Sequence, residues 1–206
     1  MKNLTSFLDH RISYFAFLIG LHAIYFPLNR TIQGGWVLAV SWDALIPFWP
    51  MWAIPYLASL LWWLGSYIWA YLKMDTTRFR ALIISMAFTL VTSYLVYIVF
   101  PTYVERPNVV GTGWQHELIR NIFENDRVNN AFPSGHTYTT MLIVFFWWQW
   151  QPKYRWLWLA IAIIIILSTL FTGQHNLLDP LGGIAWAWFG YLFGNWWTQK
   201  GRLRDI

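Results

Sequence analysis

The chain has 206 residues, of which 57% are hydrophobic and 11% charged, and it has no cysteine, which excludes disulfide frameworks and cysteine nucleophiles. Such a composition excludes a disordered chain and argues against an ordinary soluble domain, in which about 25% of residues are charged. The net charge of +5 comes mostly from basic residues at the ends of apolar runs, so a membrane explains it better than nucleic acid does.

Six apolar runs follow one another along the chain, each near the length that a bilayer demands. They cover residues 12–28, 51–72, 81–100, 136–150, 156–172 and 180–197. Residues 30–50 are broken by Gly, Pro and Asp43 and are rich in Trp, which predicts a re-entrant or interfacial segment. The pattern predicts an all-α, polytopic membrane helix bundle with about six transmembrane helices, forming a single domain over residues 1–206.

The distribution of charge predicts the orientation in the membrane. Most Lys and Arg residues lie in the N-terminus, in loops 73–80 and 151–155, and in the C-terminus. The positive-inside rule makes that side cytoplasmic. The polar loop 101–135, in which we expect a short helix around 114–124, then lies on the non-cytoplasmic face. We expect an integral protein of a cell membrane, such as the bacterial inner membrane, with both termini in the cytoplasm.

Residues 133–136, Pro-Ser-Gly-His, open the fourth apolar run. Ser134 is a natural N-cap, and the free N–H groups of the first helical turn form an anion site beside His136. Gly135 lets a ligand approach the backbone closely. Taken alone, the same pattern also fits a simple helix cap followed by a chance histidine.

His175 precedes Asp179 by four residues, just before the sixth run. Asp179 is a natural N-cap with Pro180 at the first helical position, and its carboxylate can also bond one imidazole nitrogen. The other nitrogen is then free to attack. The alternative is that Asp179 only caps the helix and His175 faces water. Because Arg106 and His136 fall on the same membrane face, the set predicts a phosphate site with a nucleophile and an acid.

These motifs resemble those of the type 2 phosphatidic acid phosphatase superfamily. Its pattern comprises a motif that ends in Arg-Pro, then Pro-Ser-Gly-His, then Ser, His and Asp at fixed spacing. The matching residues are Arg106 and Pro107, residues 133–136, and Ser168, His175 and Asp179. The resemblance covers about residues 80–198 and includes the order of the motifs and their places at the ends of spans.

The resemblance implies a role for each matching residue. His175 would be the nucleophile that forms a phosphohistidine, Asp179 would orient it, and His136 would protonate the leaving alkoxide. The residues that would hold the phosphoryl oxygens are Arg106, Ser134 and Gly135. The resemblance further implies catalysis without a metal or other cofactor, with a membrane lipid phosphate as the substrate.

Two cations of the family pattern are missing, because Val99 and Thr169 stand where the pattern has Lys and Arg. Arg120 or Arg127 could compensate. The departures point to the branches that make inositol phosphosphingolipids or sphingomyelin, and residues 43–50 also resemble the inositol-phosphotransferase-like branch.

We therefore expect a lipid phosphate phosphatase that acts through a phosphohistidine at the non-cytoplasmic face. The first alternative is a lipid phosphotransferase that passes the phosphoryl-linked group to an alcohol, because the same intermediate serves both reactions. Two other interpretations are a non-catalytic lipid-binding or transport protein and a metal-dependent hydrolase. The ligands of that metal would be His136, His175 and Asp179.

Overall fold

The structure is a computed structural model that describes residues 2–202, with side chains for residues 11–200. Arg204, one of the basic residues of the C-terminus, therefore lies outside the described residues. The α-helices are α1 (Lys2–Ala23), α2 (Tyr25–Thr31), α3 (Ala53–Lys73), α4 (Thr76–Val99), α5 (Trp114–Asn125), α6 (Gly135–Trp150), α7 (Arg155–Phe171) and α8 (Leu178–Arg202). Short 3-10 helices are η1 (Ser41–Leu45), η2 (Pro50–Trp52) and η3 (Pro152–Tyr154). The all-α fold class is confirmed, as is the short helix in the polar loop, which is α5.

In the part of the chain that the structure describes, three helical segments are long and apolar enough to cross a membrane, judged by length and composition. They are Arg11–Thr31, Thr76–Val99 and Pro152–Phe171. The other three predicted spans coincide with α3, α6 and α8. Many Trp, Tyr and Gly residues make α3 and α8 less apolar, and α6 has only 16 residues. The helical character of all six runs is confirmed, whereas six crossings stay a prediction.

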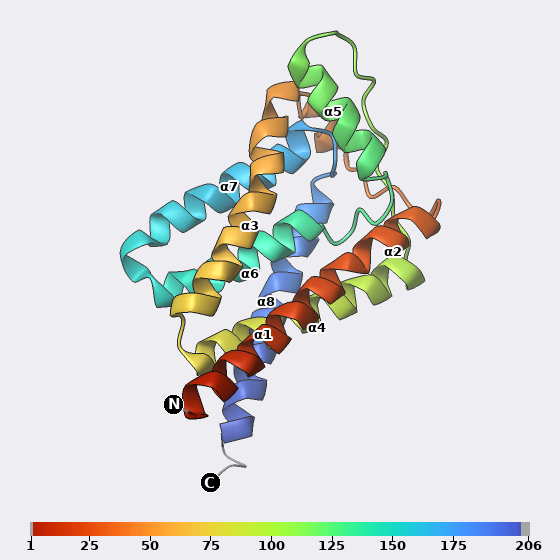
Figure 1. Ribbon diagram of the computed structural model, residues 1–206. Coiled ribbons are helices and arrows are strands. Elements are labelled where there is room, and N and C mark those ends of the chain that lie inside the picture. The colour runs from red at the N-terminus through yellow and green to blue at the C-terminus, as the bar shows by residue number, and fades with distance from the viewer. Residues whose placement is uncertain (1, 203–206) are drawn as a thin grey trace.

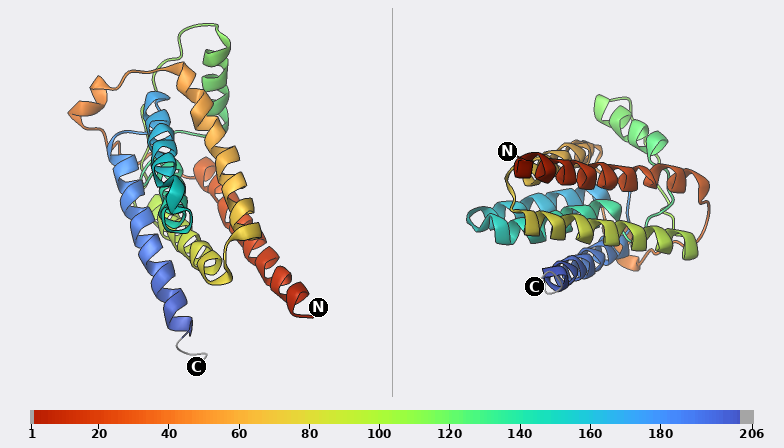
Figure 2. Two further views of the ribbon diagram at one scale, coloured as in Figure 1. Left: turned by 90° about the vertical axis from the view of Figure 1, so that its left-hand side faces the viewer. Right: turned by 60° about the horizontal axis from the view of Figure 1, so that its bottom comes forward.

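The helices form a bundle whose two ends differ in character (Figure 1). The start of α1 and the end of α8 lie at one end, and α5 lies at the other (Figures 1 and 2). Helix α4 packs against α1, α6 and α8, so it runs through the middle of the bundle. Termini at the same end agree with an even number of crossings, and the polar loop gathers at the opposite end.

Helices α4 and α8 approach each other closely because glycines of α8 face small polar side chains of α4. A Cβ atom at Gly190 would collide with Thr89, and one at Gly194 would collide with Ser85. Small residues permit this kind of backbone approach between membrane helices. The contact fixes α8, and with it the turn that precedes it, relative to the rest of the bundle.

The segment between α2 and α3 is mostly irregular and crosses the end of the bundle that carries α5 (Figure 2). Two of its tryptophans, Trp36 and Trp42, are exposed. Its far end rests on α7, where the Trp49 amide donates to the carbonyl oxygen of Phe171 at 2.8 Å. The segment thereby lies against the turn that joins α7 to α8.

Candidate active site

Buried hydrogen bonds hold the irregular backbone that leads into α6. The Phe132 amide donates to the hydroxyl of Thr102 at 2.8 Å. The hydroxyl of Tyr97, from α4, donates to the carbonyl oxygen of Pro133 at 2.8 Å. The peptide bond between Phe132 and Pro133 is cis. The two hydrogen bonds fix the position at which α6 begins.

Ser134 caps α6, as its sequence position predicts. Its hydroxyl oxygen accepts from the amide of Thr137 at 3.4 Å and from the hydroxyl of Thr137 at 3.2 Å. The Ser134 amide donates to the carbonyl oxygen of Asp179 at 3.0 Å. The cap thus connects the second motif directly to the third.

His175 and Asp179 lie together as the four-residue spacing predicts. His175 Nδ1 is 3.3 Å from Asp179 Oδ2, and Asp179 is only 1% exposed. The same carboxylate oxygen accepts from the amide of Asn176 at 2.9 Å. An imidazole that donates from Nδ1 to a carboxylate keeps the lone pair on Nε2, which leaves Nε2 as the ring atom that could attack.

A tight turn presents His175 to the site. The carbonyl oxygen of Thr169 accepts from the amides of Gln174 at 3.0 Å and His175 at 3.2 Å. Gly173 has a φ of +68°, in the left-handed region that favours glycine. Pro107 fills the space that a Cβ atom at Gly173 would need, with its Cδ 2.5 Å from that position. The Arg-Pro motif therefore supports the turn through its proline.

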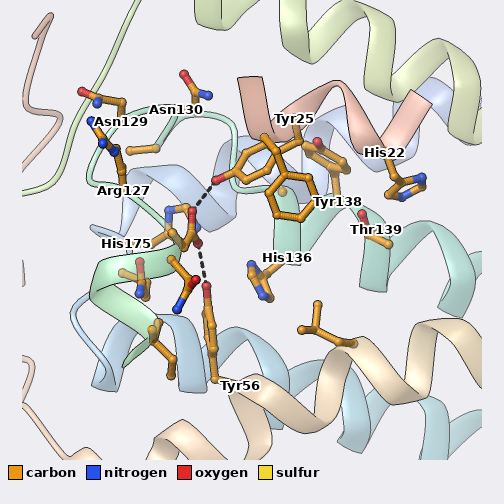
Figure 3. Close-up of a pocket in the computed structure, with 18 of the residues that line it drawn as sticks. His22, Tyr25, Tyr56, Arg127, Asn129, Asn130, His136, Tyr138, Thr139 and His175 are labelled. Atoms are coloured by element: carbon orange, nitrogen blue, oxygen red, sulfur yellow. Dashed lines mark hydrogen bonds between the residues drawn. The ribbon is translucent and has the colours of Figure 1, made fainter. Parts of the chain in front are cut away.

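His136 and His175 line one cavity of about 370 Å³ (Figure 3). His136 enters from the first turn of α6, and Gly135 lies beside it. Polar residues of the loop after α5, among them Asn130, form one part of the wall. Apolar side chains form much of the rest: Phe26, Leu57, Leu60, Trp63, Leu90 and Tyr94. The site thus joins two histidines to a space that suits a hydrocarbon chain.

Aromatic side chains of α3 hold the ring of His136. Tyr56 stacks on it with centroids 4.2 Å apart and an interplanar angle of 27°. The hydroxyl of Tyr56 donates to Asp126 Oδ2 at 2.9 Å, and Tyr25 donates to Asp126 Oδ1 at 2.7 Å. His136 Nε2 is buried without a hydrogen-bond partner among the described residues. One imidazole nitrogen of a residue that lines the cavity is therefore left without a hydrogen bond from the described part of the protein.

Arg106 does not line this cavity but a neighbouring hollow. Its guanidinium donates to the carbonyl oxygens of Phe123 at 3.0 Å and Asp126 at 2.6 Å, and to Gln174 Oε1 at 2.6 Å. Burial lowers the pKa of Arg106, and the carboxylate of Asp126 opposes that shift. In this arrangement Arg106 orders the turn before α8 and the loop after α5, and it reaches the lining of the cavity through its bonds to Asp126 and Gln174.

The structure distinguishes the two arginines that could replace the missing cations. Val99 is 81% exposed at the end of α4, and Thr169 is buried with its hydroxyl on a carbonyl oxygen of its own helix. Arg120 forms an ion pair with Glu117 at 2.6 Å outside the cavity. Arg127 lines the cavity (Figure 3). Of the two, Arg127 is the cation in place to meet a bound anion.

Sequence reasoning missed four residues of the site, namely Tyr56, Asp126, Asn130 and Gln174. Tyr56 and Asp126 come together from segments 70 residues apart, which no local pattern reveals. Asn130 has a φ of 62°, which is uncommon outside glycine but tolerated by asparagine. Its place in an Asn-rich stretch was the only available signal.

No group of three or more His, Asp or Glu side chains in the described part of the chain is arranged to hold a metal ion. The set of His136, His175 and Asp179 therefore does not form a ready-made metal centre.

A family model described as the PAP2 superfamily matches residues 81–203, which is more than half of the chain. The match runs from α4 through α8 and includes all three motifs. No curated protein and no solved structure matches the chain.

Proposed function

The chain belongs to the PAP2 superfamily, whose members are phosphoric ester hydrolases or phosphotransferases, and from this we propose that it hydrolyses the phosphate ester of a membrane lipid through a phosphohistidine on His175. The observation that carries the proposal is the placement of two histidines in one cavity, with His175 bonded through Nδ1 to the buried Asp179. The helices that are long and apolar enough to cross a membrane are consistent with a lipid substrate.

In the first half-reaction, His175 Nε2 attacks the phosphorus atom. A P–N bond forms while the P–O bond to the leaving group breaks. The departing alkoxide takes a proton from His136, which acts as the general acid. Asp179 keeps the attacking imidazole in the right tautomer and stabilises the positive charge that develops on it.

In the second half-reaction, a water oxygen attacks the phosphorus of the phosphohistidine. His136, now neutral, takes the proton from this water, and the P–N bond breaks to release His175. The stacked ring of Tyr56 lies against the imidazolium that forms, 4.2 Å away between centroids. An aromatic face stabilises a cation of this kind.

The lining of the cavity supports a lipid as the substrate. Phe26 on α2 and Leu60 on α3 both line the cavity and are exposed on the outside of the bundle. A hydrocarbon chain can therefore lie between these helices with its phosphate at the histidines. We place this site at the non-cytoplasmic face of a cell membrane, such as the bacterial inner membrane, because the basic loops lie toward the other end.

One observation favours transfer to an alcohol as a second candidate. Residues 43–50, which resemble the inositol-phosphotransferase-like branch, rest on the turn that carries His175. The amide of Leu177 donates to Asp43 Oδ1 at 2.7 Å. An acceptor alcohol bound by this segment would arrive beside the phosphohistidine and attack in place of water.

The test uses purified full-length protein in detergent, with a chelator present. It is incubated with a panel of lipid phosphate esters, with and without added inositol or other alcohols, and both free phosphate and new lipids are measured. The matched control variants are His175→Ala and His116→Ala, the second on α5 and away from the cavity.

Product release that needs His175 but not His116 supports the proposal. A new lipid that forms only with an alcohol would move the assignment to the transferase. Activity that disappears with the chelator would favour metal-dependent hydrolysis. Product formed equally by wild type and His175→Ala would exclude His175 as the nucleophile, and no product from either would favour a non-catalytic scaffold.

A further inference from the structure

Two residues that line the cavity have buried side-chain amides whose hydrogen-bonding capacity the protein leaves partly or wholly unused. Asn130 is only 2% exposed, and neither its amide nitrogen nor its amide oxygen has a partner. It lines the cavity (Figure 3). Burying an amide without a partner is costly, so an unsatisfied amide at a cavity wall points to a ligand.

The second amide is oriented by an arginine. Gln174 Oε1 accepts from Arg106 at 2.6 Å, and only the oxygen of an amide can accept such a bond. The nitrogen, Nε2, must therefore be the atom left over, and it is buried without a partner. Gln174 lines the same cavity as Asn130. Arg106 thus contributes to this wall indirectly: it orients Gln174, whose neutral amide nitrogen is the donor left for a ligand.

Arg127 adds the positive charge. The described part of the chain places no carboxylate within ion-pair distance of its guanidinium. Its backbone is fixed, because its amide donates to Asn29 Oδ1 at 2.9 Å. A guanidinium can donate two parallel bonds to phosphoryl oxygens.

The wall of the cavity carries one formal charge of each sign, and the two are not paired with each other. Among the described side chains that line the cavity, and leaving the histidines aside, only Asp126 and Arg127 carry charge. Asp126 accepts hydrogen bonds from Tyr25 and Tyr56. These two hydrogen bonds stabilise the carboxylate, so Arg127 is the cation left for a bound anion, together with the unpartnered amide nitrogens of Asn130 and Gln174.

We propose that Arg127 and the amides of Asn130 and Gln174 form a cradle for the phosphate group, and that this cradle selects a phosphodiester, with one negative charge, over a dianionic phosphomonoester. The inference rests on the proposed function, since it concerns the phosphate that His175 attacks.

The selectivity follows from charge balance. A phosphomonoester carries about 1.5 to 2 negative charges at neutral pH. While the histidines are neutral, amide donors can bond its oxygens but cannot neutralise them, and a second negative charge in a buried site needs a second cation. A diester brings only the charge that Arg127 compensates, and its third oxygen substituent is an uncharged ester.

The reaction balances for such a substrate. His175 Nε2 forms a bond to phosphorus, one of the two P–O ester bonds breaks, and the alkoxide leaves with the proton of His136. The phosphohistidine retains the other ester and one negative charge. Water or an alcohol then attacks, His136 recovers the proton, and the P–N bond breaks.

The test compares three probes that share one alkyl chain: hexadecyl phosphate, hexadecyl methyl phosphate and hexadecyl methylphosphonate. The phosphonate matches hexadecyl phosphate in size but carries a single charge, which separates charge from shape. Binding to the full-length His175→Ala protein, which cannot turn the probes over, is measured by calorimetry in a maltoside detergent, well above the second phosphate pKa of about 6. We expect both monoanions to bind at least about tenfold more tightly than the dianion.

Variants test the cradle itself in the same background. Arg127→Gln is expected to weaken the binding of both monoanions by roughly tenfold or more, while Arg120→Gln, paired outside the cavity, leaves it unchanged. Asn130→Gly, which keeps the positive φ, is expected to weaken it by about threefold.

Tighter binding of the dianion would overturn the selectivity. Equal binding by Arg127→Gln and Arg120→Gln, or no binding of any probe, would overturn the cradle. Either result can coexist with turnover that depends on His175 in the lipid panel, so the proposed function is judged separately.

Discussion

The amide of Ser134 donates a hydrogen bond of 3.0 Å to the carbonyl oxygen of Asp179. This bond joins the first residue before α6 to the second residue of α8, although 45 positions separate them in the chain. His136 follows Ser134 by two residues and His175 precedes Asp179 by four, so the proposed general acid and the proposed nucleophile lie on either side of one backbone contact. The packing of α8 on the start of α6 therefore constrains how the two histidines lie relative to each other.

Gly183 tests that packing. A Cβ atom at this position of α8 would lie 2.7 Å from Thr137 Cβ and 2.9 Å from the carbonyl oxygen of Ser134. We expect Gly183→Ala to destabilise the protein by about 1–3 kcal/mol, because the two helices must separate, and to lower turnover with it. Thermal unfolding in detergent, followed by size-exclusion chromatography with fluorescence detection, measures the first effect.

The control is Gly65→Ala in α3, where a Cβ atom would have nothing within 4 Å. It should leave both stability and turnover near the wild-type values. If the two alanine variants behave alike, close packing of α8 on the start of α6 does not constrain the site.

Asp179→Asn tests the orientation of the nucleophile. Asparagine keeps the shape of the side chain and can still accept from the amide of Asn176, but it loses the charge that fixes His175. We expect kcat to fall by roughly 10²- to 10⁴-fold with a small change in KM. Asp75→Asn is the matched control, because Asp75 caps α4 at the other end of the bundle. A loss confined to KM would instead assign Asp179 to substrate binding.

His136→Ala tests the general acid. We expect a loss of roughly 10²- to 10⁴-fold for substrates with alkoxide leaving groups, which need a proton as they depart. Substrates with good leaving groups, such as nitrophenolate, are expected to lose far less, because they depart without help. Steady-state rates for a pair of esters that differ only in the leaving group provide the measurement, and equal losses for both would contradict the assignment.

Two substitutions of Tyr56 distinguish the effect of its stacked ring on His136 from the effect of its hydrogen bond to Asp126. Tyr56→Phe keeps the stacked ring and removes only the hydrogen bond to Asp126, whereas Tyr56→Leu removes the ring as well. A desolvated aromatic face stabilises a cation by about 2 kcal/mol, so we expect Tyr56→Leu to lower kcat by roughly 30-fold and Tyr56→Phe by much less. Equal losses in the two variants would assign the effect to the hydrogen bond with Asp126.

Local sequence patterns predicted the parts of the site that depend on neighbouring residues. The cap at Ser134 and the pair of His175 and Asp179 follow from spacing along one turn, and the structure confirms both. The roles of Arg106 and Asn130 depend on which distant segments meet at the end of the bundle. Arg106 matches its motif, yet its two terminal nitrogens donate to carbonyl oxygens and to Gln174, which only the tertiary structure reveals.

In the fold as well, local sequence patterns predicted some features, and others depend on the tertiary structure. Apolar runs located the helices to within a few residues, because burial in a bilayer requires a continuous apolar surface. The first run is an exception, since α1 begins at Lys2 and a break near Ile24 separates it from α2. Composition alone also leaves the crossings by α3, α6 and α8 open, because tryptophan and tyrosine favour the interface as well as the protein interior.

The absence of cysteine allows a direct test of orientation. Val110 is exposed in the loop before α5, and Lys153 is exposed in the loop between α6 and α7, near the opposite end of the bundle. We expect a membrane-impermeant maleimide to label Val110→Cys in intact cells, and Lys153→Cys only after the membrane is opened. The reason is that the basic loops stay in the cytoplasm while the loop that forms the site lies outside. The reverse labelling pattern would place the site in the cytoplasm, and labelling of both variants in intact cells would rule out a membrane between the two loops.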